Sequence, residues 1–343
     1  MKRRPLVLLG VAALATLGLL FQPVRILGPS MLPTLEDGEL RLTVPLWAAP
    51  PSRHDLVVFR EPDTELVAVK RVAGLPGERI QLIDGDLFID GGRHARAVGG
   101  PEDLVPLVDA EGTEIAAQFN LPDHGEEGAA ILHDQGRAYL RSVPLDGYLS
   151  RGALHEGARP ASDLGLAADF ELLEAGSLFE LLVVEGGTTF ALAIGEGSCT
   201  LWEGEVLLAS TELPLDLDRG QLFLGKVDQL LYACLDGRLL FEPAPFSPIA
   251  ATPMVDALAG PPFEQAGFGG HQVLLRRVRV GRDLFRDPAG TYGCSRELQL
   301  AEDEYFLLGD NPGSSRDSRH YGPVPRERLL GAVGSRLWGP AGG

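Results

Sequence analysis

A long apolar stretch, PLVLLGVAALATLGLLF at residues 5–21, follows the basic residues 2–4 near the start of the chain. As a helix it reaches about 26 Å, slightly less than the ~30 Å hydrocarbon core of a bilayer, so it predicts a short membrane anchor over residues 1–22. The basic residues predict a cytoplasmic N-terminus, with the rest of the chain on the opposite side. A cleaved secretory signal has a similar pattern, but its A-x-A motif follows the apolar core. Here Ala13-Leu14-Ala15 lies inside that core, which favours an uncleaved anchor.

Short segments with the composition of β-strands follow the apolar stretch. Residues 38–44, 55–60 and 65–72 are rich in apolar and β-branched residues and are separated by turns that contain Pro or Gly. Residues 80–90, IQLIDGDLFID, predict a hairpin around Asp84-Gly85-Asp86. Because little of this part of the chain has a helical period, we expect a mainly β fold.

The pattern weakens in the middle of the chain and then sharpens again. Residues 95–164 are rich in Gly, Asp, Glu and Pro and predict an irregular connection of loops and short strands. Residues 165–287 consist of short alternating segments with turn signals between them, including the Asp-Gly hairpin signal in CLDGRLLF. This spacing predicts an antiparallel β-sandwich, and its pattern resembles lectin-like jelly rolls. Residues 304–338 predict a strand (EYFLLGD), a polar loop and a final apolar segment.

Composition narrows the classes of function. The formal charge of −18 argues against a nucleic-acid partner, because phosphate binding needs clustered Lys and Arg. Cys199, Cys234 and Cys294 lie far apart without C-x-x-C spacing, which argues against a metal cluster. One disulfide and one remaining thiol would fit an extracytoplasmic compartment, and the sequence leaves the pairing open. It implies no metal and no cofactor.

Ser30, between Pro29 and Met31, is the candidate nucleophile. The seven histidines are scattered, mostly in polar loop contexts, and no G-x-S-x-G motif supports a Ser-His-Asp triad. The other candidate base is Lys70, which stands among valines in VAVKRVAG. Burial would lower its pKa, and the neutral amine could then accept a proton from a serine hydroxyl. Taken alone, such a lysine more often packs its stem on the strand and keeps its ammonium in water.

Four sequence blocks favour a general-base role for Lys70 over a purely structural one. They are GPSMLPTLEDGE, HDLVVF, KRVAGLPGE and GDNPGSSRDSRHYGPVP. In this order they closely resemble blocks of bacterial type I signal peptidases, over roughly residues 1–92 and 300–338. The resemblance implies a membrane-bound serine endopeptidase that cleaves signal peptides from exported preproteins. It implies Ser30 as the nucleophile, Lys70 as the general base and Ser315 as a hydrogen-bond partner that orients the Lys70 amine.

The same resemblance implies roles for further residues. The supporting residues that it implies around the site are Arg71, Asp310, Asp317 and Arg319. The residues that it implies for the small apolar pockets, which accept the −1 and −3 side chains of a signal peptide, are Val24, Ile26, Met31, Leu35 and Val69. The implied partners are signal peptides, the lipid bilayer and Sec-type translocation machinery, at the bacterial cytoplasmic membrane with the catalytic domain on the extracytoplasmic side.

The resulting division of the chain has five parts. They are the anchor (1–22), the first part of a catalytic core (23–94), an irregular connection (95–164), an inserted β-sandwich (165–287) and the second part of the core (288–343). The sandwich could bind a sugar, a peptide or the cell wall, or be an inert insertion, because fold does not fix function. A membrane-anchored binding module with inactive peptidase blocks therefore stays open as an alternative. A soluble self-cleaving Ser/Lys protease of the repressor type fits less well, since it would lack an anchor.

Because residue 28 is a glycine, the sequence does not show which group is the second hydrogen-bond donor to the oxyanion. Some members of the resembled family have a serine there, whose hydroxyl assists the oxyanion alongside the backbone N–H of the nucleophile. Gly28 offers no hydroxyl. Gly28→Ser is therefore expected to leave activity unchanged or to raise it, if the backbone tolerates a Cβ.

Overall fold

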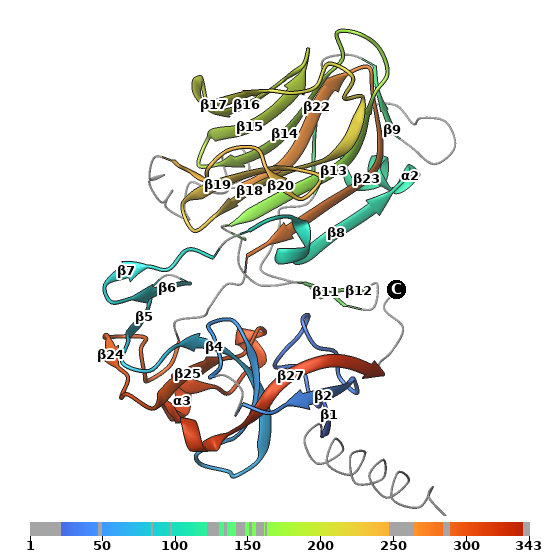
Figure 1. Ribbon diagram of the computed structural model, residues 1–343. Helices are drawn as coiled ribbons and strands as arrows, with labels where there is room; N and C mark the ends of the chain where they lie inside the picture. Colours follow the sequence, from blue (N-terminus) through green and yellow to red (C-terminus); the bar gives the residue numbers. More distant parts are fainter. Residues whose placement is uncertain are drawn as a thin grey trace, which may run out of the picture. The chain divides into compact units, whose positions relative to one another are not determined.

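The computed structural model describes two compact units of mainly β structure (Figure 1). Unit 1 combines residues 1–94 with 285–343, and unit 2 comprises residues 95–284. The described residues are 22–46, 50–83, 85–96, 98–121, 130–133, 136–141, 148–150, 153–155, 161, 163–246, 264–283 and 289–338. Within these ranges no helix has both the length and the apolar character needed to cross a membrane. The apolar stretch at residues 5–21, expected to be an anchor, lies outside the described residues.

Unit 1 is built on a seven-stranded antiparallel sheet with the order β1-β2-β27-β3-β4-β25-β26. A second, four-stranded sheet has the order β24-β5-β6-β7. The strands of the larger sheet are β1 (Pro23–Arg25), β2 (Leu40–Val44), β3 (Leu56–Arg60), β4 (Val67–Gly74), β25 (Glu304–Leu308), β26 (Val324–Pro325) and β27 (Leu329–Trp338). Those of the smaller sheet are β5 (Arg79–Ile83), β6 (Asp86–Ile89), β7 (Gly92–Arg93) and β24 (Leu298–Gln299). The short helix α3 (Ser318–Tyr321) and the 3₁₀ turns Pro312–Ser314 and Arg326–Arg328 follow β25 in the chain.

The strands that the sequence predicted in unit 1 are confirmed. The three strands predicted before residue 72 correspond to β2, β3 and β4, and the hairpin predicted at residues 80–90 is β5–β6. Along β3, Val57 and Phe59 pack into one apolar cluster, whereas Val58 packs into another with Ile26 and Met31. This alternation follows from the two-residue period of a strand. Because both faces of β3 are covered, a side chain on the paired strand β4 lies in largely apolar surroundings.

Unit 2 consists of a six-stranded and an eight-stranded antiparallel sheet packed on a shared core. The six-stranded sheet has the order β10-β22-β14-β15-β16-β17, and the eight-stranded sheet includes the path β20-β19-β18-β13-β23-β8 with β9 and β21 at its sides. The strands of the six-stranded sheet are β10 (Gly136–Tyr139), β14 (Leu178–Glu185), β15 (Thr188–Gly195), β16 (Ser198–Glu203), β17 (Val206–Glu212) and β22 (Glu264–His271). Those of the other sheet are β8 (Val105–Glu111), β9 (Ala130–Leu132), β13 (Leu164–Leu172), β18 (Arg219–Val227), β19 (Leu230–Leu235), β20 (Arg238–Leu239), β21 (Ala244–Pro245) and β23 (Val273–Arg282). The remaining elements are the 3₁₀ turn Pro101–Asp103, helix α2 (Thr113–Gln118) and the pair β11 (Tyr148–Ser150) and β12 (Ala153–His155).

Inward-facing side chains from both sheets form the core of unit 2. Phe179 and Phe190 from the six-stranded sheet share one cluster with Leu166 and Leu224 from the eight-stranded sheet. The predicted Asp-Gly hairpin is confirmed between β19 and β20, where Asp236 and Gly237 have φ of 49° and 71°. Two consecutive positive φ angles are what a type I′ turn requires.

The stretch at residues 95–164, expected to be an irregular connection, contributes strands to this sandwich. β8 pairs with β23 from Arg277↔Glu111 to Arg282↔Val105, and β10 lies at the edge of the six-stranded sheet. Phe119 after α2 is fully buried in the shared core. Sequence reasoning missed this because the partner strand of β8 lies far along the chain, so no local period reveals the pairing.

No disulfide joins the three cysteines, all of which lie in described parts of the chain. Cys199 and Cys234 are buried thiols in unit 2. Burial raises the pKa of Cys199 to about 12 and that of Cys234 to about 11, so both remain protonated and unreactive at neutral pH.

We expect a fragment of residues 95–284 to fold on its own, and a fragment of residues 165–284 to be less stable by about 3 kcal/mol or more. The shorter fragment lacks β8 to β10 and buried core side chains such as Leu107 and Phe119. Urea denaturation followed by circular dichroism measures both free energies of unfolding. Equal stability of the two fragments would contradict the assignment of residues 95–164 to the sandwich core.

Candidate active site

Ser30 lies in the turn that follows β1, and a second segment of the chain fixes its backbone. Leu35 N donates to Met31 O at 2.9 Å within the turn. From the loop after β25, Asn311 N donates to Ser30 O at 3.1 Å and Asn311 Nδ2 donates to Pro29 O at 3.1 Å. The hydroxyl of Ser30 is therefore presented from a backbone that is held on both sides.

Lys70 on β4 brings its amine to this hydroxyl. Its Nζ lies 2.8 Å from Ser30 Oγ and 3.0 Å from Val69 O, and the side chain is only 3% exposed. Burial lowers the pKa of Lys70, because the charged ammonium loses its hydration there. A lowered pKa increases the fraction of neutral amine, which can take a proton from the neighbouring hydroxyl.

Three carboxylates near Lys70 oppose this shift, since Asp317, Glu61 and Asp310 each raise its pKa. Each of the three is held by an arginine instead of by the lysine. The pairs are Asp317 with Arg319 at 2.8 Å, Asp310 with Arg71 at 2.5 Å and Glu61 with Arg316 at 3.5 Å. Because a guanidinium does not deprotonate, it balances the carboxylate charge permanently. Among the residues that the structure describes, the Lys70 amine has no ion-pair partner.

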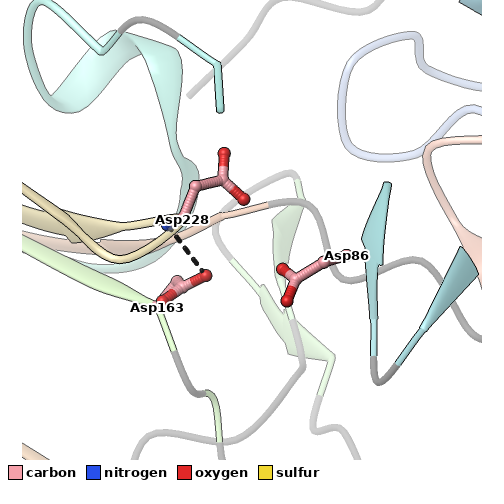
Figure 2. A group of neighbouring side chains, drawn as sticks. All are labelled: Asp86, Asp163 and Asp228. Carbon is pink, nitrogen blue, oxygen red and sulfur yellow. Dashed lines mark hydrogen bonds between the residues drawn. The ribbon is translucent and has the colours of Figure 1, made fainter. Parts of the chain in front are cut away.

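Lys226 in unit 2 shows what a buried structural lysine looks like in the same chain. It is 2% exposed, and its Nζ lies 2.8 Å from Glu185 Oε2 and 3.4 Å from Asp163 Oδ1. Figure 2 shows that Asp163 also accepts a hydrogen bond from the Asp228 backbone N–H, at 3.3 Å. Lys226 is thus bound by carboxylates, whereas Lys70 faces a hydroxyl. Burial alone does not distinguish the two lysines, but their partners do.

Ser315 lies close to Ser30 and Lys70, but it does not make the hydrogen bond to the Lys70 amine that the sequence analysis expected. Its hydroxyl donates to Asp317 Oδ2 at 2.8 Å, and within the described residues Lys70 and Ser315 share no hydrogen bond. Asp317 is fully buried and also accepts from Gly309 N at 3.0 Å. Burial opposes its ionisation, but the bonds from Arg319, Gly309 and Ser315 hold the pKa of Asp317 below its usual range. Ser315 is therefore linked by a hydrogen bond to Asp317, the carboxylate whose charge raises the pKa of Lys70.

Gly309 is a site residue that the sequence analysis did not single out. A Cβ at this position would collide with the Ser315 side chain and would lie 2.7 Å from Ser30 O. The absence of a side chain lets the loop after β25 approach both serines. Together with Asn311, Gly309 belongs to the GDN run, which carried the signal in the sequence although the role of each residue did not follow from it.

Arg71 and Asp310 form a two-point ion pair at the edge of the site. Arg71 Nε lies 2.8 Å from Asp310 Oδ1, and Arg71 Nη1 donates to His54 O at 2.8 Å. The arginine on β4 thereby ties the loop after β25 to the turn before β3. Both residues thus lie at the edge of the site, and their supporting role there stays a prediction.

The five residues expected to shape apolar pockets come together in space. They belong to one cluster with Val58, Leu56 and Val333, and the five are Val24, Ile26, Met31, Leu35 and Val69. Met31 and Leu35 are each 1% exposed, so they serve as packed core in this conformation, whereas Val24 is half-buried at the rim. The cluster includes Met31 next to Ser30 and Val69 next to Lys70, so the Ser30–Lys70 pair borders an apolar cluster.

Gly28 adopts a backbone conformation that corrects the expectation for its substitution. Its φ is +82°, a region that L-residues rarely adopt, although a Cβ there would meet nothing within 4 Å. In this conformation its N–H donates to Asp37 Oδ1 at 2.8 Å. A serine at this position would therefore strain the backbone two residues before Ser30.

Parts of this chain are similar in sequence to known signal peptidases. "Signal peptidase I" of Bacillus licheniformis is 39% identical over 84 residues, which are 24% of this chain and 45% of the relative. "Signal peptidase I T" of Bacillus subtilis is 40% identical over 75 residues, 21% of this chain and 38% of the relative. "Probable signal peptidase I-2" of Synechocystis sp. is 45% identical over 51 residues, 15% of this chain and 22% of the relative. The chain thus matches less than half the length of each of these relatives.

A solved carbohydrate-binding module, CBM66 from Bacillus subtilis, covers 53% of this chain with 12% identity and a TM-score of 0.28, too low to support any argument. The family model is more informative, because it matches residues 3–119 and 282–338, just over half of the chain, and these ranges contain both Ser30 and Lys70. The chain therefore belongs to the signal peptidase family, peptidase S26.

Proposed function

We propose that this protein is a membrane-anchored Ser/Lys endopeptidase that removes N-terminal signal peptides from exported preproteins. The observation that carries the proposal is the 2.8 Å distance between Lys70 Nζ and Ser30 Oγ in a buried setting, within a member of the signal peptidase family. The lowered pKa of Lys70 and the arginine partners of the nearby carboxylates support the same chemistry.

In the proposed reaction, Ser30 Oγ attacks the scissile carbonyl carbon while the neutral Lys70 amine takes the hydroxyl proton. The oxyanion of the tetrahedral intermediate is stabilised by backbone donors, of which the Ser30 N–H is one. The Lys70 ammonium then gives its proton to the leaving amine, and the mature protein departs. A water molecule, deprotonated by Lys70, hydrolyses the ester and releases the signal peptide.

The surrounding residues support this chemistry by position. Ser315, Asp317 and Arg319 hold the loop after β25 against Ser30, and Arg71 and Asp310 tie the same loop to β4. The cluster of Val24, Ile26, Met31, Leu35 and Val69 provides the apolar wall against which small −1 and −3 side chains of a signal peptide would pack. Apolar pockets for small side chains would favour alanine at these positions of the signal peptide.

The location follows from the proposed substrate. Residues 1–22 would anchor the enzyme in the bacterial cytoplasmic membrane, with the catalytic unit on the extracytoplasmic side. The scissile bond of a preprotein emerges there, just beyond its own apolar segment. The lipid bilayer and the Sec-type translocation machinery are the corresponding proposed partners.

Ser30→Ala is expected to reduce preprotein cleavage by about a thousandfold or more, because it removes the attacking oxygen. Ser315→Ala should reduce cleavage less, since Ser315 acts through Asp317. Ser314→Ala, at the exposed neighbouring position, is the matched control and should cleave like the wild type. The measurement is the initial rate on a purified preprotein in detergent, with the product identified by N-terminal sequencing. Near wild-type cleavage by Ser30→Ala would rule out Ser30 as the nucleophile.

The lowered pKa of Lys70 predicts how cleavage depends on pH. The value of kcat/KM should rise with pH through a limb whose midpoint lies below the ordinary lysine value of ~10.4, because only the neutral amine accepts the proton. Lys70→Arg should be inactive, since a guanidinium stays protonated. An active Lys70→Arg variant would contradict the role of general base.

Lys70→Met should be inactive as well, yet its free energy of unfolding at neutral pH should equal or exceed that of the wild type. The native pKa of Lys70 is lowered, so below the unfolded-state pKa the unfolded chain binds more protons and the buried amine lowers stability. Lys226→Met is the matched control, since it deprives Glu185 and Asp163 of their cation and should cost about 2 kcal/mol. A Lys70→Met variant destabilised like Lys226→Met would indicate a structural lysine.

Gly28→Ser is now expected to lower the free energy of unfolding by about 1 kcal/mol and to lower the cleavage rate, because φ is +82° at this position. Gly313→Ala is the control: a Cβ there also meets nothing within 4 Å, and its φ lies outside the left-handed region. Thermal unfolding and the preprotein assay provide the two readouts. A stable and more active Gly28→Ser variant would show that the turn readjusts and gains a hydroxyl donor.

A further inference from the structure

The outer face of the six-stranded sheet in unit 2 has a hollow of about 510 Å³, which none of the proposed catalytic residues lines. We call it the Trp202 hollow. Its lining residues are Arg137, Glu180, Gly187, Thr188, Thr189, Ala191, Ala193, Trp202 and Gly204. They come from strands β10, β14, β15 and β16 and from the turns beside them, so the hollow belongs to unit 2 alone.

Small side chains on strand β15 form the bottom of the hollow, which we call its floor. Along β15, Ala191 and Ala193 line the hollow, whereas Phe190 and Leu192 alternate with them and pack in the core of the sandwich. Because the inward residues are large and the outward ones are small, the sheet is well packed below and open above. The floor therefore results from the alternation of large inward and small outward residues along β15.

Larger side chains flank this floor on both sides. Trp202 on β16 is the direct cross-strand neighbour of Ala191, and it is only half-buried. On the other side Glu180 is the cross-strand neighbour of Ala193, and Arg137 binds it at two points, Nε to Oε1 at 2.7 Å and Nη2 to Oε2 at 3.2 Å.

The Arg137–Glu180 pair depends on a glycine between the two strands that carry it. Gly269 on β22 is the cross-strand neighbour of both residues. A Cβ at Gly269 would lie 2.6 Å from Glu180 Oε1 and 3.1 Å from Arg137 Cγ. The missing side chain lets the two-point ion pair lie across β22, so its donors and acceptors are positioned before any ligand arrives.

The chemistry of this lining selects among ligand classes. The charge of Arg137 is balanced by Glu180, and the chain as a whole carries −18, so anionic ligands are disfavoured. The floor strand β15 is paired on both sides, with β14 and with β16, so an extended peptide would find no free main-chain partners there. A sugar ring brings its own hydroxyl donors and acceptors and has an apolar C–H face that fits an indole.

We propose that the Trp202 hollow binds a neutral saccharide, with one ring stacked on Trp202 and adjacent hydroxyls held by Arg137 and Glu180. Thr188 and Thr189 at the end of the hollow add further hydroxyl partners. This binding site is separate from the peptidase function proposed above and does not depend on it. It would hold the chain at a surface that displays neutral polysaccharide.

The test uses the full-length Ser30→Ala protein, so that binding is measured without proteolysis. The protein is purified in a detergent without a sugar headgroup, because a glucoside or maltoside would compete for the site. Neutral α- and β-linked oligosaccharides of glucose, mannose, galactose and N-acetylglucosamine are titrated up to millimolar concentration, with calorimetry and tryptophan fluorescence as readouts. We expect at least one of them to bind with 1:1 stoichiometry.

Trp202→Ala should weaken that binding by about tenfold or more, because the stacked face is lost. Trp338→Ala is the matched control, since Trp338 is 62% exposed on β27 of unit 1 and should leave binding unchanged. Ala193→Leu fills the floor while Trp202 stays in place, and it should also abolish binding. Unchanged thermal unfolding of unit 2 in each variant separates loss of the site from loss of the fold.

Three results would overturn the proposal. One is the absence of binding by every oligosaccharide at millimolar concentration. Another is binding that Trp202→Ala and Ala193→Leu leave intact. The third is capture of a synthetic signal peptide that Trp202→Ala releases, which would make the hollow a peptide site. The preprotein assay on the active protein is independent, so a failed peptidase proposal and a failed saccharide proposal give different results.

Discussion

The arrangement of the candidate site depends on the burial of one amine. Lys70 is 3% exposed, and its Nζ has a hydroxyl and a backbone carbonyl as hydrogen-bond partners where a buried lysine would ordinarily have a carboxylate. Burial destabilises the ammonium and lowers the pKa of Lys70. The apolar packing on both faces of β3 and β4 supplies that environment, so the packing that holds unit 1 together also lowers the pKa of Lys70, as the proposed general base requires.

The arginines around the site resolve a conflict that such burial creates. Carboxylates orient loops well through multiple hydrogen bonds, but any carboxylate near Lys70 stabilises its charged form. Asp317 and Asp310 each receive two or more bonds from an arginine, which stays charged at every relevant pH. The loop after β25 is thereby fixed by ionic bonds, while the hydrogen-bond partners of the amine within the described part of the chain, Ser30 Oγ and Val69 O, are both neutral.

Unit 2 also contains a buried lysine and alternating apolar strands, but neither forms part of the candidate active site. Its buried Lys226 is bound by two carboxylates, and its central strand β15 turns large residues inward and alanines outward. A unit with its own core can be carried between β7 and β24 without contributing to the core clusters of unit 1. This independence leaves its outer face available for a role that the peptidase blocks do not constrain.

The sequence by itself determined the strands of unit 1, the Asp-Gly hairpin of unit 2 and the identity of the residues around Ser30 and Lys70, because these depend on local periodicity and on short motifs. Tertiary structure decided three other features. β8 joins the sandwich because its partner β23 is distant in the chain, and Ser315 reaches the site through Asp317 because Gly309 lets the loop approach. The φ of +82° at Gly28 goes together with the bond from its N–H to Asp37. Each of these depends on contacts between residues whose proximity no local pattern encodes.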